Sequence, residues 1–113
     1  MELGEAFGTA GSGTTKLYRA VSQAEFEQLM STGRFEAGPN ALEGKFFAES
    51  VQDAATWGEA LEGPGRYRIV EVELPTDVAN NFMRWAGLDG IGPARYGEFN
   101  QLQDVVIRQC RHE

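Results

Sequence analysis

Cysteine and histidine are almost absent from this chain of 113 residues, which contains one of each, Cys110 and His112. A single cysteine excludes a disulfide within the chain, and this pair is too small a set for a His/Cys metal site. The same shortage argues against Ser-His and Cys-His catalysis. We therefore expect no metal, and we interpret Cys110 as a packed side chain in an apolar C-terminal run.

Basic residues are also scarce: 17 Asp and Glu face 10 Lys and Arg, which gives a formal net charge of -7. A protein that coats nucleic acid needs a clustered basic surface, so this balance argues against a nucleic-acid partner but not against a local basic pocket for a phosphorylated ligand. Because no run of about 18 apolar residues is present, a membrane-spanning helix is excluded. A basic segment followed by an apolar one is missing at the N-terminus, so we expect no secretory signal.

The remaining composition is that of a folded protein, with 42% hydrophobic and 24% charged residues. A chain of this length has room for one domain with a modest core. Residues 1–15 are rich in glycine, serine and threonine, which indicates a flexible lead-in or a junction with a larger upstream carrier. We expect the folded domain to span residues 16–113.

A strand followed by a capped helix opens this domain. The run Lys16-Leu-Tyr-Arg-Ala-Val21 predicts a short strand over residues 16–21. Ser22 and Glu25 then have the form of a capping box, in which Ser22 binds the third helical N–H and Glu25 reaches back. Gly33 ends the predicted helix.

The rest of the chain repeats this alternation of short elements. In chain order we expect a strand over 45–49, a helix from Ser50 through Ala60, and a strand over 67–74 with Val70, Val72 and Leu74 on one face. A third helix is expected to begin at a cap formed by Thr76 or Asp77, to carry Val78, Phe82 and Trp85, and to end at Gly87. A glycine-rich loop over 87–97 and a strand over about 104–110 complete the chain. This order predicts an α+β fold with a compact split β-sheet and short helices.

Six residues at the edges of these elements are candidates for a site. They are Arg19, Phe46, Phe47, Ser50, Trp57 and Glu98. Together they suit cleavage of the bond between ribose and nicotinamide, which passes through an oxocarbenium-like transition state. A fixed carboxylate stabilises that positive charge, an aromatic face stacks on nicotinamide, and a guanidinium binds diphosphate or ribose through its planar fork.

Each candidate also has a purely structural interpretation. Arg19 can be an edge residue with a solvated head, Ser50 a helix N-cap and Trp57 a core residue. Neighbouring strand residues point to opposite faces, so one of Phe46 and Phe47 belongs to the core. Glu98 can be a loop carboxylate, although glycine-rich loops of this kind tend to carry function.

Three stretches of the chain resemble ADP-ribosyltransferases: Leu17-Tyr-Arg19, Gly44-Lys-Phe-Phe-Ala-Glu-Ser50 and Asp89-Gly-Ile-Gly-Pro-Ala-Arg-Tyr-Gly-Glu98. The resemblance is closer still to the C-terminal toxin domains of Rhs-type polymorphic toxins, in particular those that modify elongation factor Tu after type VI secretion. It covers most of the chain after Lys16, and the last stretch is the most specific.

The resemblance implies a split-sheet ADP-ribosyltransferase core with NAD as co-substrate. Arg19 matches the first-strand arginine that grips NAD, and Phe46 or Phe47 matches the aromatic residue beneath nicotinamide. The spacing of Phe46 and Trp57 resembles that of two tyrosines that sandwich nicotinamide in one branch, and Ser50 resembles a serine that supports the catalytic glutamate in another. Glu98 matches the catalytic glutamate.

The chain departs from the family pattern at two points, and the second concerns the acceptor. A full Ser-Thr-Ser triplet is absent, since Ser50 follows Ala48-Glu49. Tyr96-Gly97 precedes the glutamate instead of the Glu-x-Glu or Gln-x-Glu that accompanies transfer to arginine or asparagine, so an arginine acceptor is disfavoured.

By resemblance the chain is an antibacterial toxin domain, delivered by a secretion system into the cytoplasm of a competitor cell. Its protein substrate is then elongation factor Tu, the 87–97 loop meets that substrate, and a cognate immunity protein protects the producer. Two other interpretations stay open: an NAD glycohydrolase that passes ADP-ribose to water, and a non-enzymatic binding or immunity module.

Overall fold

The computed structural model describes residues 13–36, 44–88, 90–103 and 105–110. Residues 1–12 of the predicted lead-in, His112, and Asp104 at the start of the predicted last strand lie outside these ranges. The elements of the described part are β1 (Thr14–Val21), α1 (Gln23–Thr32), β2 (Gly44–Ala48), α2 (Val51–Leu61), β3 (Arg68–Pro75), α3 (Thr76–Asn80), β4 (Met83–Leu88), β5 (Gly92–Glu98), the 3-10 helix η1 (Phe99–Gln101) and β6 (Val106–Gln109). The predicted α+β class is confirmed.

The strands form a six-stranded sheet in the order β4-β5-β2-β1-β3-β6, and every neighbouring pair is antiparallel. The pairs on either side of its centre are extensive: β1 and β3 share a register from Thr14↔Pro75 to Val21↔Arg68, and β2 and β5 share one from Gly44↔Glu98 to Ala48↔Ala94. At the centre, β1 and β2 share the single pair Tyr18↔Ala48.

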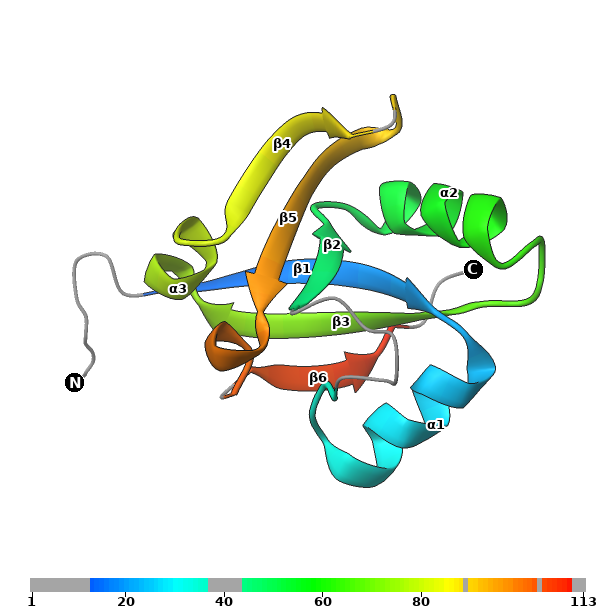
Figure 1. The fold of residues 1–113 in the computed structure, drawn as a ribbon, viewed down its shortest axis with the longest axis horizontal. Coiled ribbons are helices and arrows are strands. Elements are labelled where there is room, and N and C mark those ends of the chain that lie inside the picture. Colours follow the sequence, from blue (N-terminus) through cyan, green and yellow to red (C-terminus); the bar gives the residue numbers. More distant parts are fainter. Residues whose placement is uncertain (1–12, 37–43, 89, 104, 111–113) are drawn as a thin grey trace.

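The sheet therefore consists of two halves that separate at this central pair. We call β1, β3 and β6 the first half-sheet, and β2, β5 and β4 the second half-sheet. Figure 1 shows β2, β5 and β4 running steeply across β1 and β3, with α2 beside the place where the halves part.

Both predicted serine caps are present. The Ser22 hydroxyl accepts a hydrogen bond from the Glu25 N–H, and Gly33 ends α1 in the left-handed conformation with φ 75°. The Ser50 hydroxyl accepts from the Asp53 N–H in the same way. The capping box differs from the prediction in one respect, because the Glu25 carboxylate binds Arg19 instead of reaching back to the start of the helix.

The main core lies against one face of the first half-sheet. Alternate residues of β1 and β3 enter it, as the period of a strand requires, and α1 covers it with Phe26 and Leu29. Its fully buried side chains are Leu17, Val21, Leu29, Phe47, Val70, Val72 and Leu74. The predicted face of Val70, Val72 and Leu74 is confirmed.

The third helix and the glycine-rich loop were predicted wrongly. Helix α3 ends at Asn80, so Phe82 and Trp85 lie outside it, and the chain then forms the antiparallel pair β4–β5. The apolar residues at 78, 82 and 85 have a helical spacing, but Asn80 and Asn81 are weak helix formers and a ladder with β5 satisfies the backbone from Met83 onward. Gly90 makes the turn with φ 74°.

Candidate functional site

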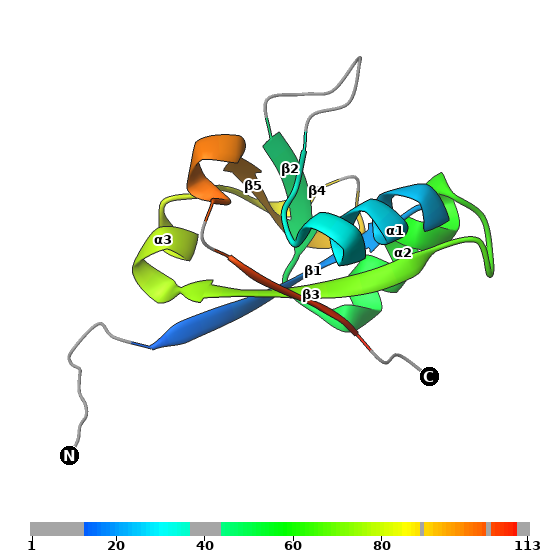
Figure 2. The same ribbon diagram turned by 90° about the horizontal axis from the view of Figure 1, so that it is seen from below.

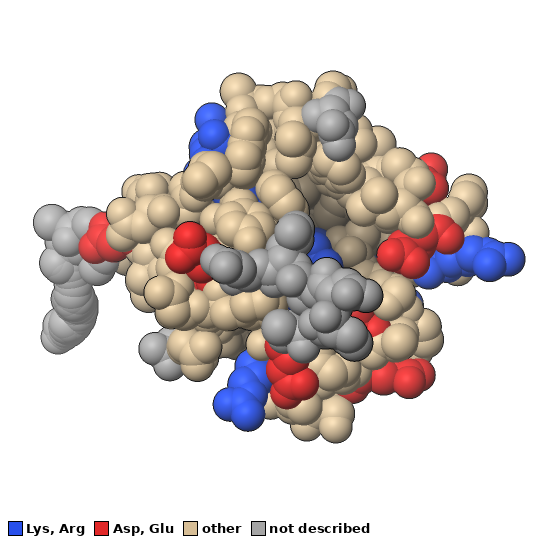
Figure 3. Space-filling view, in the orientation of Figure 1, with Lys and Arg blue, Asp and Glu red and all other residues tan. Residues whose placement is uncertain are grey.

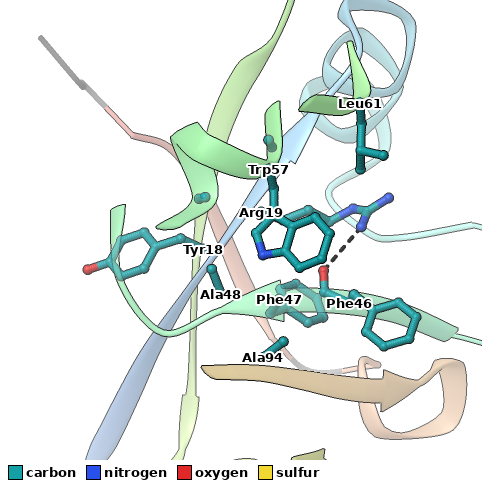
Figure 4. Close-up of a pocket in the computed structure, with 10 residues that line it drawn as sticks. Tyr18, Arg19, Phe46, Phe47, Ala48, Trp57, Leu61 and Ala94 are labelled. Atoms are coloured by element: carbon teal, nitrogen blue, oxygen red, sulfur yellow. Dashed lines mark hydrogen bonds between the residues drawn. The ribbon is translucent and has the colours of Figure 1, made fainter. Parts of the chain in front are cut away.

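A pocket of about 130 Å³ lies where the two half-sheets part (Figure 4). Strands β1 and β2, the end of β5 nearest the turn and the inner side of α2 supply its walls. The lining residues are Tyr18, Arg19, Ala20, Phe46, Phe47, Ala48, Ala54, Trp57, Leu61 and Ala94. In Figure 3 the surface is hollowed near its centre, with basic atoms at the edge of the hollow.

The pocket brings together four of the six candidate residues, Arg19, Phe46, Phe47 and Trp57. Ser50 is placed at the N-terminus of α2, where its hydroxyl caps the helix. Glu98 is placed at the end of β5. Neither of these two residues lines the pocket.

Arg19 crosses the gap between the half-sheets. Beyond the pair Tyr18↔Ala48, the β2 backbone has no ladder partner on β1. The Arg19 guanidinium supplies a partner there instead, since its Nη1 donates to the Phe46 carbonyl oxygen at 3.1 Å (Figure 4). Arg19 is therefore structural and lines the pocket at the same time.

An ion cluster fixes the guanidinium of Arg19. Its Nε and Nη2 donate to the two carboxylate oxygens of Glu25 at 3.0 and 3.2 Å, and Lys45 Nζ lies 3.7 Å from the same carboxylate. All three side chains are about four-fifths buried. Burial lowers the pKa of Lys45, Glu25 opposes that shift, and Arg19 adds to it. These bonds do not use every N–H of a guanidinium, so Arg19 can contact an anion while Glu25 still holds it.

The two adjacent phenylalanines have different surroundings, as their opposite directions on a strand require. Phe47 is 1% exposed and packs edge-on against Phe35 in the core. Phe46 is partly exposed on the other face, where its ring centroid lies 4.8 Å from that of Tyr96 and 5.6 Å from that of Trp85. Phe46 is thus the phenylalanine whose ring is available to a ligand.

Tyr96 and Trp85 lie beside the Phe46 ring, and neither was among the candidates. Tyr96 lies opposite Phe46 on β5, and Trp85 lies opposite Ala94 on β4. The alternation of Met83, Arg84 and Trp85 was a signal for a strand, but it was read as part of a helix. With the strand assignment, Trp85 and Phe46 fall on the same face of the second half-sheet.

Glu98 ends β5 with its side chain exposed. It lies two residues after Tyr96 and four after Ala94, so alternation places all three on one face of the strand. The residue opposite is Gly44, where any Cβ would collide with the Gly97 carbonyl oxygen. The Glu98 carboxylate accepts the Gln101 N–H, and its own N–H donates to Gln101 Oε1 at 2.9 Å.

A second ion cluster lies beside the β4–β5 pair. Glu49 Oε2 accepts from Arg84 Nε and from Arg95 Nε, both at 2.7 Å, and Arg95 Nη1 donates to the Ala79 carbonyl. The hydrogen bond from Arg84 is the main cause that lowers the pKa of Glu49; Arg95 adds to it, and burial opposes it. Glu49 therefore ties both strands of the pair to the end of β2.

Two other features are absent from the described ranges. No group of three or more His, Cys, Asp or Glu is placed to hold a metal ion. No helix there has the length and apolar character needed to cross a membrane. Comparisons with protein-family models, with curated proteins and with solved structures find no match for this chain.

Proposed function

We propose that this chain binds NAD in the pocket between the half-sheets and transfers its ADP-ribose to a protein acceptor. One observation carries the proposal: the parting of the sheet sets the Arg19 guanidinium beside Phe46 and Trp57 in a single pocket. A flat apolar ring linked to a diphosphate is the kind of ligand that such a set recognises. The resemblance of three stretches to ADP-ribosyltransferases supports the same ligand.

The pocket is too small for a whole dinucleotide. Pockets that enclose drug-sized ligands have volumes of roughly 300–1,000 Å³, whereas this one has about 130 Å³. The nicotinamide end would occupy it against Phe46 and Trp57. The diphosphate would lie at the pocket edge, where Arg19 offers donors that Glu25 does not use.

Glu98 would act on the ribose. As the bond from ribose C1′ to nicotinamide N1 breaks, its electron pair leaves with nicotinamide and positive charge develops on the ribose. A carboxylate held in advance stabilises that charge without reorganising. The capping contacts with Gln101 hold Glu98 in this way. A nucleophile of the acceptor protein then forms the new bond to C1′ and loses its proton.

Elongation factor Tu is the proposed acceptor, on the resemblance alone. Its modification would stop translation in a competitor cell after delivery by a secretion system, and a cognate immunity protein would protect the producer. The 87–97 segment, proposed to meet this substrate, contains the end of β4 and most of β5 rather than a loop.

Incubation of the purified chain with NAD and elongation factor Tu tests the proposal by intact-protein mass spectrometry. The expected result is one added ADP-ribose, and Glu98→Gln should slow transfer by about 10²–10³-fold, the usual effect of removing one preorganised electrostatic group. The glutamine keeps an acceptor for the Gln101 N–H, so stability should change by only about 0.5 kcal/mol or less.

Glu62→Gln is the matched control, since Glu62 is an exposed carboxylate at the end of α2. It should transfer at the rate of the unchanged chain. If free ADP-ribose forms while the protein stays unlabelled, the activity is hydrolysis of NAD and not transfer. Intact NAD, together with harmless expression in a bacterium, would reject both activities in favour of a binding module.

A further inference from the structure

Two cations, Arg19 and Lys45, share the carboxylate of Glu25 beside the pocket. Arg19 Nε lies 3.0 Å and Lys45 Nζ 3.7 Å from the same oxygen, Oε2 of Glu25. Arg19 belongs to β1 in the first half-sheet, Lys45 to β2 in the second, and Glu25 to the first turn of α1. Figure 2 shows α1 and β2 on the same side of β1 and β3, where this carboxylate joins them.

The cluster has one positive charge in excess. Within the described ranges, Glu25 is the only carboxylate that forms an ion pair with Arg19 or Lys45. Because all three side chains are largely buried, water and salt screen the excess charge less than they would at an exposed site. Burial lowers the pKa of Lys45 and Arg19 adds to this shift, against the opposing effect of Glu25. A second anion beside the two cations would neutralise the excess.

Both cations keep donors for such an anion. The 3.7 Å contact of Lys45 with Glu25 is longer than a hydrogen bond of good geometry, and an ammonium has three N–H donors. The three described hydrogen bonds of Arg19 use three of the five N–H groups of a guanidinium. Because both cations contact one carboxylate oxygen, they lie close enough together for the two phosphoryl groups of a single diphosphate.

The pocket extends toward this cluster. Neighbouring residues of a strand point to opposite faces, yet Phe46 and Phe47 both line the pocket. The pocket therefore runs through the parting of the sheet instead of lying on one face. Arg19 lines it as well, and Lys45 lies on the same face of β2 as Phe47. A ligand with its ring against Phe46 can thus extend past Arg19 toward Lys45.

We infer that Lys45 and Arg19 form a diphosphate-binding site, in which each cation binds one phosphoryl group and Glu25 holds both cations in place. The inference rests on the proposed function where it takes this diphosphate to be part of NAD. Lys45 is then a second residue that binds NAD, and Glu25 is a positioning residue. The diphosphate would also bridge the two half-sheets, because the two cations come from different halves.

Removing the Lys45 charge tests this inference by equilibrium binding. Lys45→Met keeps most of the side-chain length and leaves Glu25 paired with Arg19, so the fold should persist, which circular dichroism checks. Quenching of tryptophan fluorescence measures binding, because Trp57 lines the pocket. In the Glu98→Gln background, which slows turnover, the Kd for NAD should rise by about tenfold or more, since a charge-assisted contact with phosphate is lost. The Kd for nicotinamide riboside, which has no phosphate, should stay within about twofold.

Lys16→Met is the matched control, because Lys16 is the only other lysine of the chain and is exposed on β1. It removes the same charge, and both Kd values should stay within about twofold of those of the Glu98→Gln chain, as expected for an exposed charge. If Lys45→Met raised the Kd for NAD and for nicotinamide riboside equally, or raised neither, the diphosphate site would be overturned.

A second measurement leaves the site unchanged and decides the question even if Lys45→Met does not fold. The ¹⁵N signals of the side-chain ammonium groups are followed by NMR, and Lys16→Met assigns the signal of Lys16. Inorganic pyrophosphate should shift the Lys45 signal in a saturable way and leave the Lys16 signal in place. An unmoved Lys45 signal, or equal shifts of both signals, would overturn the site.

These measurements separate this inference from the proposed function. If neither NAD nor nicotinamide riboside quenches the fluorescence of the unchanged chain, the proposed function fails, while the pyrophosphate titration still decides the diphosphate site. If NAD binds equally well to the unchanged chain and to Lys45→Met, only the diphosphate site fails.

Discussion

The two half-sheets of this molecule differ in how deeply their side chains are buried and in what they expose. In the first, β1 and β3 pair over their full length and send alternate side chains into the main core. In the second, β4 is exposed from Met83 through Gly87, and the face of Phe46, Tyr96 and Trp85 is only partly covered. Stability thus resides mainly in the first half-sheet, whereas the second presents an aromatic surface and Glu98.

This contrast explains where the pocket lies. The halves share one residue pair, so the sheet opens without breaking the well-paired ladders on either side. Arg19 and Glu25 bridge the opening with polar contacts instead of backbone pairs. A ligand can therefore enter between two elements that are each internally complete.

Removing core volume from the first half-sheet is the strongest way to test the contrast. Leu17→Ala should lower the free energy of unfolding by about 2–5 kcal/mol, because Leu17 is 1% exposed and its loss leaves a cavity. Met83→Ala on β4 removes a side chain that is 59% exposed, and should change it by about 0.5 kcal/mol or less. Urea unfolding followed by circular dichroism measures both, and equal losses would contradict the contrast.

The same contrast shows what the sequence could predict. Strands β1 and β3 and helices α1 and α2 were predicted because their patterns are local: alternate residues are buried, and Ser22 and Ser50 begin the helices. Strand β4 was missed because Val78, Phe82 and Trp85 also have a helical spacing, and because the strand is exposed, so burial does not extend the short alternation of Met83, Arg84 and Trp85. Its partner β5 is rich in glycine and was read as a loop.

The site was predictable in part, for a related reason. Chemistry and spacing singled out Arg19, Phe46 and Trp57, which the fold brings into one pocket. The binding of Arg19 to the Phe46 carbonyl depends on how the sheet opens, and nothing local in the chain encodes it.

A methyl group at Gly44 tests the close pairing within the second half-sheet. Its Cβ would lie 2.9 Å from Glu98 Cα and would also collide with the Gly97 carbonyl, so β2 and β5 must move apart. Gly44→Ala should therefore cost about 1–3 kcal/mol, as overpacking usually does. It should also slow NAD cleavage, since Glu98 moves with β5.

Gly87→Ala is the control for that substitution, because a Cβ at Gly87 meets no atom within 4 Å. Its stability should change by about 0.5 kcal/mol or less. Thermal unfolding of the two variants side by side gives the difference. A Gly44→Ala chain as stable and as active as the Gly87→Ala chain would mean that β2 and β5 are not in close contact at this point.

The smallest expected effect concerns the ion cluster that holds the β4–β5 pair. The pKa of Glu49 is lowered in the folded chain, so its ion pairs with Arg84 and Arg95 stabilise the fold at pH values above the ordinary glutamate pKa of about 4.3. That contribution is lost as the pH falls through the lower, folded-state pKa. Glu49→Gln should cost about 1 kcal/mol or less near pH 7, the usual range for such partly screened pairs.

Hydrogen exchange locates this loss within the second half-sheet. In Glu49→Gln the amides of β4 and β5 should exchange up to about fivefold faster near neutral pH, while those of β1 and β3 keep their protection, since local opening need not involve the core. The difference from the unchanged chain should shrink as the pH is lowered below about 4, because the wild-type carboxylate is then protonated as well. If the amides of β1 and β3 lost protection equally, the two half-sheets would open as one cooperative unit, which would contradict the contrast between them.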